Sequence, residues 1–352
     1  MVSGFQASPS ETARSRRRHV AFALLVIGVL LPIYATAIDS PFLITLATRV
    51  VVLGLAAVSL DLILGYGGLV SFGHAAFVGI GAYAVGTGFY LDFNADTLLG
   101  WGGSVQAVLI WPLGVAAAAI AAFLIGAISL RTRGIGFIMI TLAFAQMLYF
   151  FFRSLRWQGD DSLALWGRSE FPGWTGLDLN DTTTFYYVAL ACLVGFTGLC
   201  LRLVGAPFGR VLMAGKQNDR RLRALGVAID RHRLAAFVLA GAGGGLAGVL
   251  LANASEFVGP AYLSWHRSGE LIVMVVLGGM GTLIGPIIGA AALVLLEEYL
   301  AEITEHWQII LGPILVGVVL FARQGILGLL EGLPIDVMTQ LRLWRARRIG
   351  DV

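Results

Sequence analysis

The run "VQAVLIWPLGVAAAAIAAFLIGAISL" spans residues 105–130 and carries no charged side chain. About 20 helical residues cross the hydrocarbon core of a bilayer, so this run is long enough for one crossing. Similar runs recur along the 352 residues, starting with "VAFALLVIGVLLPIYATA" at 20–37. Strands of a membrane β-barrel would be shorter and would alternate apolar and polar residues. The pattern therefore predicts an all-α, polytopic membrane protein.

The composition fits lipid surroundings better than a soluble core. Hydrophobic residues make up 58% of the chain and charged residues 13%, with a mean hydropathy of +0.84, whereas soluble domains carry roughly 25% charged residues. The basic "RSRRRH" before the first apolar run imitates a signal peptide. Because that run is longer than the apolar part of a usual signal, we expect a retained first helix.

About ten membrane-spanning helices are expected. With these spans, the loops and tails on one side of the membrane contain most of the basic residues. The loops on the other side contain many of the acidic residues instead. The positive-inside rule then puts both termini in the cytoplasm. The expected spans are 20–37, 42–64, 69–90, 105–129, 135–152, 185–204, 234–254, 270–280, 283–300 and 307–322.

This topology divides the chain into three parts. Residues 1–19 form a basic cytoplasmic tail, residues 20–322 the transmembrane domain, and residues 323–352 a second basic cytoplasmic tail. Within the transmembrane domain, 153–184 is expected to be an external loop and 205–233 a cytoplasmic loop.

Two glycine-rich stretches lie in different halves of the chain, "GYGGLVSFGHAAFVGIGAYAVG" (65–86) and "LGGMGTLIGP" (277–286). Glycine costs a helix interior roughly 1 kcal/mol relative to alanine, but it permits close helix packing and sharp breaks. Paired interruptions of this kind indicate a substrate path in transporters, although tight packing alone also explains any single glycine. The region 270–300 either crosses the membrane twice or forms a re-entrant pair of half-helices.

Polar and small residues near these breaks are candidates for a translocation path or gate. Asp61 either lines the path or reaches interfacial water. His74 either polarises a substrate carboxylate or bonds to a neighbouring helix, and Ser71 and Thr141 either line the path or bond to carbonyls of their own helices. The full candidate set is Asp61, Gly67, Gly68, Ser71, Gly73, His74, Gly79, Thr141, Gly278 and Gly279.

The chain carries no ATP-binding or metal motif. Its only lysine, Lys216, is followed by Gln217, whereas a P-loop requires Ser or Thr at that place. The five histidines are scattered without metal-ligand spacing, and no catalytic cluster stands out. We therefore expect no metal, no cofactor bound by this chain, no nucleic-acid partner and no enzymatic activity.

The longest cytoplasmic segment, "PFGRVLMAGKQNDRRLRALGVAIDRHRL" (207–234), contains helix signals. Pro207 can end the preceding helix, Asn218 or Asp219 can cap a new one, and Gly226 can end it. The segment is either a topogenic basic loop or a docking element with Leu222 and Leu225 as apolar anchors. The candidate docking residues are Arg210, Gln217, Asn218, Arg221, Leu222, Leu225 and Gly226.

Five ordered motifs resemble the permease subunits of branched-chain amino acid ABC importers, the LivM-like group, over roughly 42–328. They are "LDLILGYGGLVSFGHAAFVGIGAY" (60–83), "RTRGIGFIMITLAFAQM" (131–147), "GRVLMAGKQNDRRLRALGV" (209–227), "LAAFVLAGAGGGLAGVLLA" (234–252) and "VMVVLGGMGTLIGPIIGA" (273–290). The chain departs from the family at Asp61, where asparagine is frequent, and at Gly136, where an aromatic residue is usual. The resemblance therefore implies the scaffold more strongly than the cargo, which in this family includes branched-chain amino acids, urea, short amides and other small organic acids.

The resemblance also implies an ABC importer of a bacterial inner membrane, with energy supplied by other subunits. Its expected partners are a second, LivH-like permease, two ATP-binding subunits that hold ATP and magnesium, a periplasmic solute-binding protein and membrane lipid. The segment 207–227 would meet an ATP-binding subunit. The alternative class is an ion-coupled secondary transporter or channel, which requires several charges at mid-membrane depth; the chain offers Asp61 and either Glu270 or Glu297.

Overall fold

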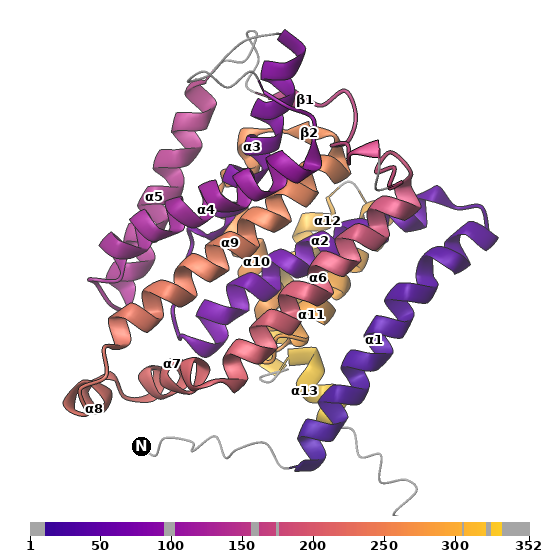
Figure 1. Cartoon of the computed structure of the whole chain (residues 1–352). Coiled ribbons are helices and arrows are strands. Elements are labelled where there is room, and N and C mark those ends of the chain that lie inside the picture. The colour runs from indigo at the N-terminus through magenta and orange to yellow at the C-terminus, as the bar shows by residue number, and fades with distance from the viewer. Residues whose placement is uncertain are drawn as a thin grey trace, which may run out of the picture.

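The structure is a computed structural model that describes residues 11–94, 103–155, 162–173, 176–304, 306–321 and 325–332. The predicted tails, 1–19 and 323–352, fall largely outside these residues. Helices dominate the described chain (Figure 1). They are α1 (Glu11–Ala37), α2 (Pro41–Asp61), the π-helix η1 (Leu62–Tyr66), α3 (His74–Asn94), α4 (Ala107–Ser129), α5 (Ile135–Ser154), α6 (Thr182–Gly205), α7 (Pro207–Gln217), α8 (Asp219–Ala224), α9 (Ile229–Ser255), the 3-10 helix η3 (Pro260–Leu263), α10 (Trp265–Gly278), α11 (Gly285–Ile303), α12 (Trp307–Phe321) and α13 (Gly325–Gly332).

Seven of the described helices are long and apolar enough to cross a membrane, which confirms a polytopic helical membrane protein. These are α1 from His19 onward, α2 with η1, α3, α4, α5, α6 and α9, and they coincide with the first seven predicted spans. The last three predicted spans coincide with α10, α11 and α12. α10 has only 14 residues and α12 only 15, so each is shorter than the roughly 20 residues of an ordinary span. The predicted count of ten spans is therefore not confirmed.

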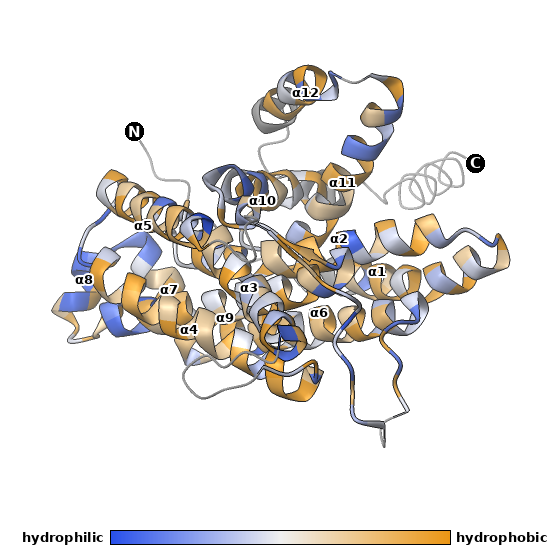
Figure 2. Cartoon of the chain, turned by 90° about the horizontal axis from the view of Figure 1, so that it is seen from above, coloured by the Kyte–Doolittle hydropathy of each residue, from blue (hydrophilic) through white to orange (hydrophobic). Residues whose placement is uncertain are grey.

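The helices α2, α3 and α9 form the buried centre, whereas few residues of α1 and α5 are buried. Figure 2 shows hydrophobic residues on the peripheral helices as well as on the central ones. A helix that is apolar on its outer face requires an apolar surrounding, and lipid supplies it. The arrangement of the helices thus agrees with the composition.

Glycines bring the backbones of α3 and α9 into contact. A Cβ atom added at Gly81 would meet the carbonyl oxygen of Gly245, and one added at Gly248 would meet the carbonyl oxygen of Val78. Helices in lipid associate through packing rather than through a hydrophobic drive, so contact at this distance requires small residues. The close contact of α3 and α9 forms part of the buried centre of the molecule.

The predicted break in 277–286 is confirmed as a turn between two antiparallel helices. A Cβ atom at Gly278 would meet the carbonyl of Gly285, and one at Gly289 would meet the carbonyl of Met274. These opposed pairs show that α10 and α11 run side by side in opposite directions. In the turn, Gly279 has φ 120° and Gly281 has φ 75°, which side chains rarely adopt. Both alternatives for 270–300 require such an antiparallel pair.

A small sheet departs from the all-α prediction. Strand β1 (Leu163–Ala164), in the predicted external loop, pairs antiparallel with β2 (Phe257–Val258), with Leu163 opposite Val258. Next to it, the backbone N–H of Ser169 donates to Oδ1 of Asn253 at 2.7 Å. These bonds tie the loop 153–184 to the end of α9.

Candidate functional site

The two glycine-rich breaks meet at Asp61, the last residue of α2. Its carboxylate is fully buried and accepts hydrogen bonds from the backbone N–H groups of Gly281 at 2.7 Å and Leu283 at 3.0 Å. A hydrogen bond to a charged group contributes about 1.5–3 kcal/mol. Asp61 therefore attaches the turn between α10 and α11 to the end of α2. The alternative that Asp61 reaches interfacial water is wrong, because the turn covers it.

Lys216 connects the cytoplasmic helix α7 to the same place. Its ammonium group donates to the carbonyl oxygen of Gly65, in η1, at 2.7 Å. A Cβ atom at Gly65 would collide with the carboxylate of Asp61 and with the backbone nitrogen of Gly281. Gly65 therefore has to be glycine, since Asp61, the hairpin turn and Lys216 converge on one backbone unit.

The break between the second and third predicted spans is confirmed, but its extent differs from the prediction. The π-helix ends at Tyr66 and α3 begins at His74, so residues 69–73, predicted as helical, lie outside both helices. The chain turns here because the N–H of Leu69 donates to the carbonyl of Ile63 at 2.9 Å. A π-helix and a turn replace the regular helix that apolar periodicity alone predicts.

The glycines of this break have close neighbours. Gly68 has φ 68°, and a Cβ atom there would lie 2.9 Å from Cγ of Lys216. A Cβ atom at Gly67 would lie 2.7 Å from the carbonyl oxygen of Ile63, and one at Gly73 would lie 2.9 Å from that of Thr141 in α5. Close approach of backbone and side chains thus explains all three glycines.

Ser71 and Thr141 are both fully buried but differ in their hydrogen bonds. The hydroxyl of Ser71 accepts from the N–H of Gly73 at 3.2 Å, because Ser71 precedes α3 and has no helical carbonyl behind it. The hydroxyl of Thr141 donates to the carbonyl of Ile138 in its own helix at 3.0 Å. Thr141 therefore bonds within its own helix and Ser71 does not, and lining of the path by either residue stays a prediction.

His74 bonds to a neighbouring helix, one of the two predicted alternatives. Its Nε2 lies 2.8 Å from the hydroxyl oxygen of Ser59 in α2. That hydroxyl donates to the carbonyl of Ala56 at 2.7 Å, so Nε2–H of His74 must be the donor to Ser59. The fully buried ring joins the start of α3 to α2, and its Nδ1 has no hydrogen-bond partner among the described residues.

Gly79 packs against η3. A Cβ atom at Gly79 would collide with Cγ of Leu263 and would lie 3.0 Å from each of its two methyl carbons. The N–H of Ala75, one turn earlier in α3, donates to the hydroxyl of Ser268 in α10 at 3.0 Å. Gly79 therefore packs closely against η3, and the bond from Ala75 ties the same helix to α10.

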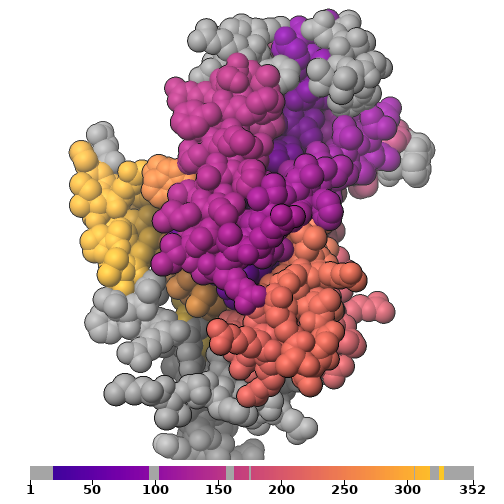
Figure 3. All heavy atoms as spheres, turned by 90° about the vertical axis from the view of Figure 1, so that its left-hand side faces the viewer, coloured from indigo at the N-terminus to yellow at the C-terminus, as the bar shows by residue number. Residues whose placement is uncertain are grey.

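The cytoplasmic segment folds as its helix signals predict. Pro207 begins α7, and the side chain of Asn218 caps α8 by accepting the N–H of Arg221 at 3.0 Å. Gly226 follows α8 with φ 78°. Figure 3 shows α7 and α8 beside α4 and α5 at one end of the molecule.

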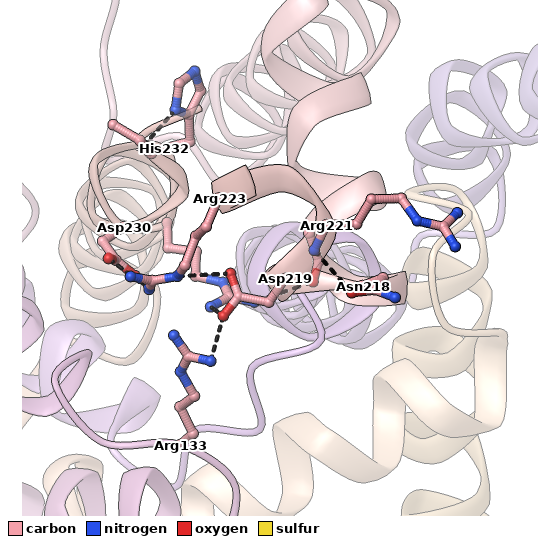
Figure 4. Close-up of polar contacts among 10 residues, drawn as sticks. Arg133, Asn218, Asp219, Arg221, Arg223, Asp230 and His232 are labelled. Atoms are coloured by element: carbon pink, nitrogen blue, oxygen red, sulfur yellow. Dashed lines mark hydrogen bonds and ion pairs between the residues drawn. The ribbon is translucent and has the colours of Figure 1, made fainter. Parts of the chain in front are cut away.

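A cluster of ion pairs centred on Asp219 holds α8 in place (Figure 4). Asp219 pairs with Arg133 from the connection between α4 and α5, with Arg223 at 3.4 Å and with Arg233 at 3.7 Å. Arg223 also pairs with Asp230 at 2.7 Å. Exposed ion pairs contribute little singly, but this cluster spans three elements and fixes how α8 is presented.

The two predicted anchors differ in exposure. Leu225 is 73% exposed, whereas Leu222 is half-buried and its Cδ1 would lie 3.7 Å from a Cβ atom at Gly215 in α7. Leu225, the residue directly after α8, is therefore the exposed anchor of the two. The remaining candidates on this surface, Arg210, Gln217 and Arg221, are exposed.

Sequence reasoning did not find Lys216, Arg133 or Gly65. Lys216 is the only lysine among 24 basic residues, and that rarity was a usable signal. The ion pair between Arg133 and Asp219 joins residues 86 positions apart, so no local pattern reveals it. Among the described residues, no group of His, Cys, Asp and Glu could hold a metal ion.

Comparison with known proteins shows to which family the chain is related. Residues 42–322 match the model of "Branched-chain amino acid transport system / permease component". The high-affinity branched-chain amino acid transport system permease protein LivM of Salmonella typhimurium is 29% identical in an alignment 334 positions long, which covers 87% of this chain and 73% of that protein. The probable LivM of Methanocaldococcus jannaschii is 26% identical in an alignment 281 positions long, which covers 70% of this chain and 77% of that protein.

A more distant relative matches only part of the chain. The autoinducer 2 import system permease protein LsrC of Yersinia enterocolitica is 32% identical in an alignment 143 positions long, which covers 38% of this chain and 37% of that protein. No solved structure gives a significant match. The family match covers α2 to α12 and so includes both breaks, Asp61 and the segment that carries Lys216. The chain belongs to the family of branched-chain amino acid transport system permease components.

Proposed function

We propose that this chain is the membrane-spanning permease subunit of an ABC importer that moves branched-chain amino acids, or a related small polar solute, across a bacterial inner membrane. The observation that carries the proposal is the family match over residues 42–322, nearly the whole transmembrane part. The absence of a P-loop after the only lysine supports energy supply by other subunits. In this function the chain forms part of the translocation path and changes conformation with the ATP-binding subunits, and it catalyses no reaction itself.

The proposed complex contains a second, LivH-like permease, two ATP-binding subunits and a periplasmic solute-binding protein. ATP and magnesium bind to the ATP-binding subunits, and this chain holds no cofactor. The exposed face of α8, with Leu225 and Arg221, fits the groove of an ATP-binding subunit, because short amphipathic helices bind in grooves through residues three or four apart. Arg221 steers association more than it adds affinity.

The junction at Asp61 supplies a physical route from α8 to the membrane helices. Movement of α7 reaches η1 through the bond from Lys216 to Gly65, and η1 reaches the turn of α10 and α11 through Asp61. Packed elements shift as units between discrete arrangements. Closure of the ATP-binding subunits would thus alter the position of α10 relative to α2 and α3, which switches access from outside to inside.

The proposed orientation puts both termini and the α7–α8 segment in the cytoplasm and the loop 153–184 in the periplasm. Single cysteines at Ser162 and Asn218, in a background lacking Cys192 and Cys200, test it. An impermeant thiol reagent added to intact cells with permeabilised outer membranes is expected to label position 162 and not 218. Labelling of position 218 under these conditions contradicts the orientation.

Reconstitution tests the function itself. The chain is purified with its permease partner and ATP-binding subunits, placed in vesicles, and supplied with the solute-binding protein, radiolabelled leucine and ATP. Uptake should require ATP and should stop when either the binding protein or the ATP-binding subunits are omitted. Uptake by this chain alone, driven by a proton or sodium gradient, would instead support the ion-coupled alternative.

A further inference from the structure

A cavity of about 40 Å³ lies between α2, α3, α9, η3 and α10, apart from the junction at Asp61. Apolar side chains of four helices form most of its wall, and polar side chains from α2, η3 and α10 complete it. Its charged lining residues are Arg49, Arg267 and Glu270, and Leu53 lies in its apolar wall.

The cavity has an apolar floor and a charged rim. Val78, Leu271 and Met274 are at most 6% exposed, whereas the side chains of Arg49 and Arg267 are 42% and 38% exposed. Ligand sites typically combine an apolar wall with a few polar groups that fix orientation. This division fits a molecule with an apolar end and a charged end.

Charges of both signs stand at the rim. Arg49 pairs at 3.2 Å with Glu297, which does not itself line the cavity, and Arg267 pairs at 2.7 Å with Glu270, which does. The four charges cancel, so a ligand with a single net charge would leave one charge uncompensated. A guanidinium has five N–H donors and a carboxylate accepts several hydrogen bonds. Each member of these pairs therefore keeps capacity for a ligand carboxylate or ammonium group.

We propose that this cavity is a transient binding site for a zwitterionic α-amino acid with an apolar side chain, on the permease itself. The inference rests on the proposed function. The arginines bind the carboxylate, Glu270 binds the ammonium group, and the side chain lies on the floor formed by Val78, Leu271 and Met274. An anionic analogue of the same shape binds only the arginines, and a cationic analogue binds only Glu270.

The site must widen to bind its ligand. A water molecule needs roughly 10–15 Å³ of such space, so 40 Å³ holds a few water molecules but not an amino acid. Widening requires α10 to move away from α2 and α3. The turn at Gly279 and Gly281 gives α10 a pivot at its inner end, and the same turn is held by Asp61.

Cysteine protection tests the site without relying on transport. Leu53→Cys places a thiol in the wall, in a chain lacking Cys192 and Cys200, with Ala228→Cys on the cytoplasmic surface as the control. In vesicles holding the full complex, leucine is expected to slow the reaction of position 53 with a small thiol reagent about tenfold. Neither 4-methylpentanoate nor isoamylamine should do so, because each carries the same side chain with one charge. The reaction at position 228 should not change.

Uptake measurements separate failure of this site from failure of the proposed function. Glu270→Gln should raise the KM for leucine about tenfold, because the ammonium group of leucine loses its ionic partner; tenfold corresponds to about 1.4 kcal/mol. Glu298→Gln, which removes a carboxylate outside the cavity, should leave KM unchanged. The site alone is overturned if the unmodified complex imports leucine but leucine does not protect position 53 and Glu270→Gln has a normal KM. Absence of leucine uptake by the unmodified complex overturns the proposed function and the site with it.

Discussion

Replacement of Lys216 by methionine is the sharpest test of the coupling route. Methionine keeps an unbranched stem beside Gly68 but removes the ammonium group that donates to Gly65 at 2.7 Å. The carbonyl of Gly65 lies on a buried residue in the last part of the π-helix. The change therefore removes the hydrogen bond that Lys216 of α7 makes to Gly65 of η1, without creating a large cavity.

The structure sets the size of the expected effect. A hydrogen bond from a charged donor contributes about 1.5–3 kcal/mol, and we take about 1.5 kcal/mol because water reaches part of the lysine side chain. If the bond forms in only one of the two access states, its loss shifts their equilibrium about tenfold, since 1.4 kcal/mol is a factor of ten. Stability of the folded permease should change by no more than that amount.

The assay is the number of leucine molecules imported per ATP hydrolysed in vesicles containing the full complex. Lys216→Met is expected to lower this ratio about tenfold while ATP hydrolysis continues. Lys216→Arg, which keeps the charge and the donors, should restore much of it. Arg220→Met removes one positive charge from the exposed surface of the same segment and serves as the matched control. An unchanged ratio in Lys216→Met, or an equal loss in Arg220→Met, refutes the route.

Three further pairs of substitutions test other contacts. Asp61→Ala leaves two buried N–H groups unpaired, at a cost of about 1–3 kcal/mol each. Asp61→Asn keeps one acceptor for the hairpin turn and should therefore lower the melting temperature in detergent less than Asp61→Ala does. Equal melting temperatures of the two variants would contradict the role of the carboxylate. Gly79→Leu should destabilise the permease by about 1–3 kcal/mol through overpacking and abolish uptake, whereas Gly198→Leu, with open space around it, should be tolerated; normal uptake with leucine at position 79 would mean that close packing there is not required. Leu225→Asp should abolish ATPase stimulation by the loaded binding protein without lowering stability, whereas Leu222→Asp should lower stability as well, and full stimulation in Leu225→Asp would remove α8 from the docking surface.

The sequence by itself determined the class of protein and the ends of several elements. Apolar runs of about 20 residues have one stable outcome, a helix in lipid, because every backbone group must be bonded internally. Local signals also placed the cytoplasmic helices correctly: Asn218 caps α8 and Gly226 follows it with φ 78°. Both effects depend only on residues within one or two turns, so a single sequence contains them.

Only the tertiary structure decided what the breaks are for. Asp61 and Gly281 are 220 residues apart, and Lys216 and Gly65 are 151 apart; no local pattern relates them. The sequence marked Asp61 as unusual but left open what it meets, and the start of α3 was misplaced because apolar residues 69 and 70 continue the helical pattern through the turn. A buried carboxylate requires donors, and which backbone supplies them depends on how the helices pack.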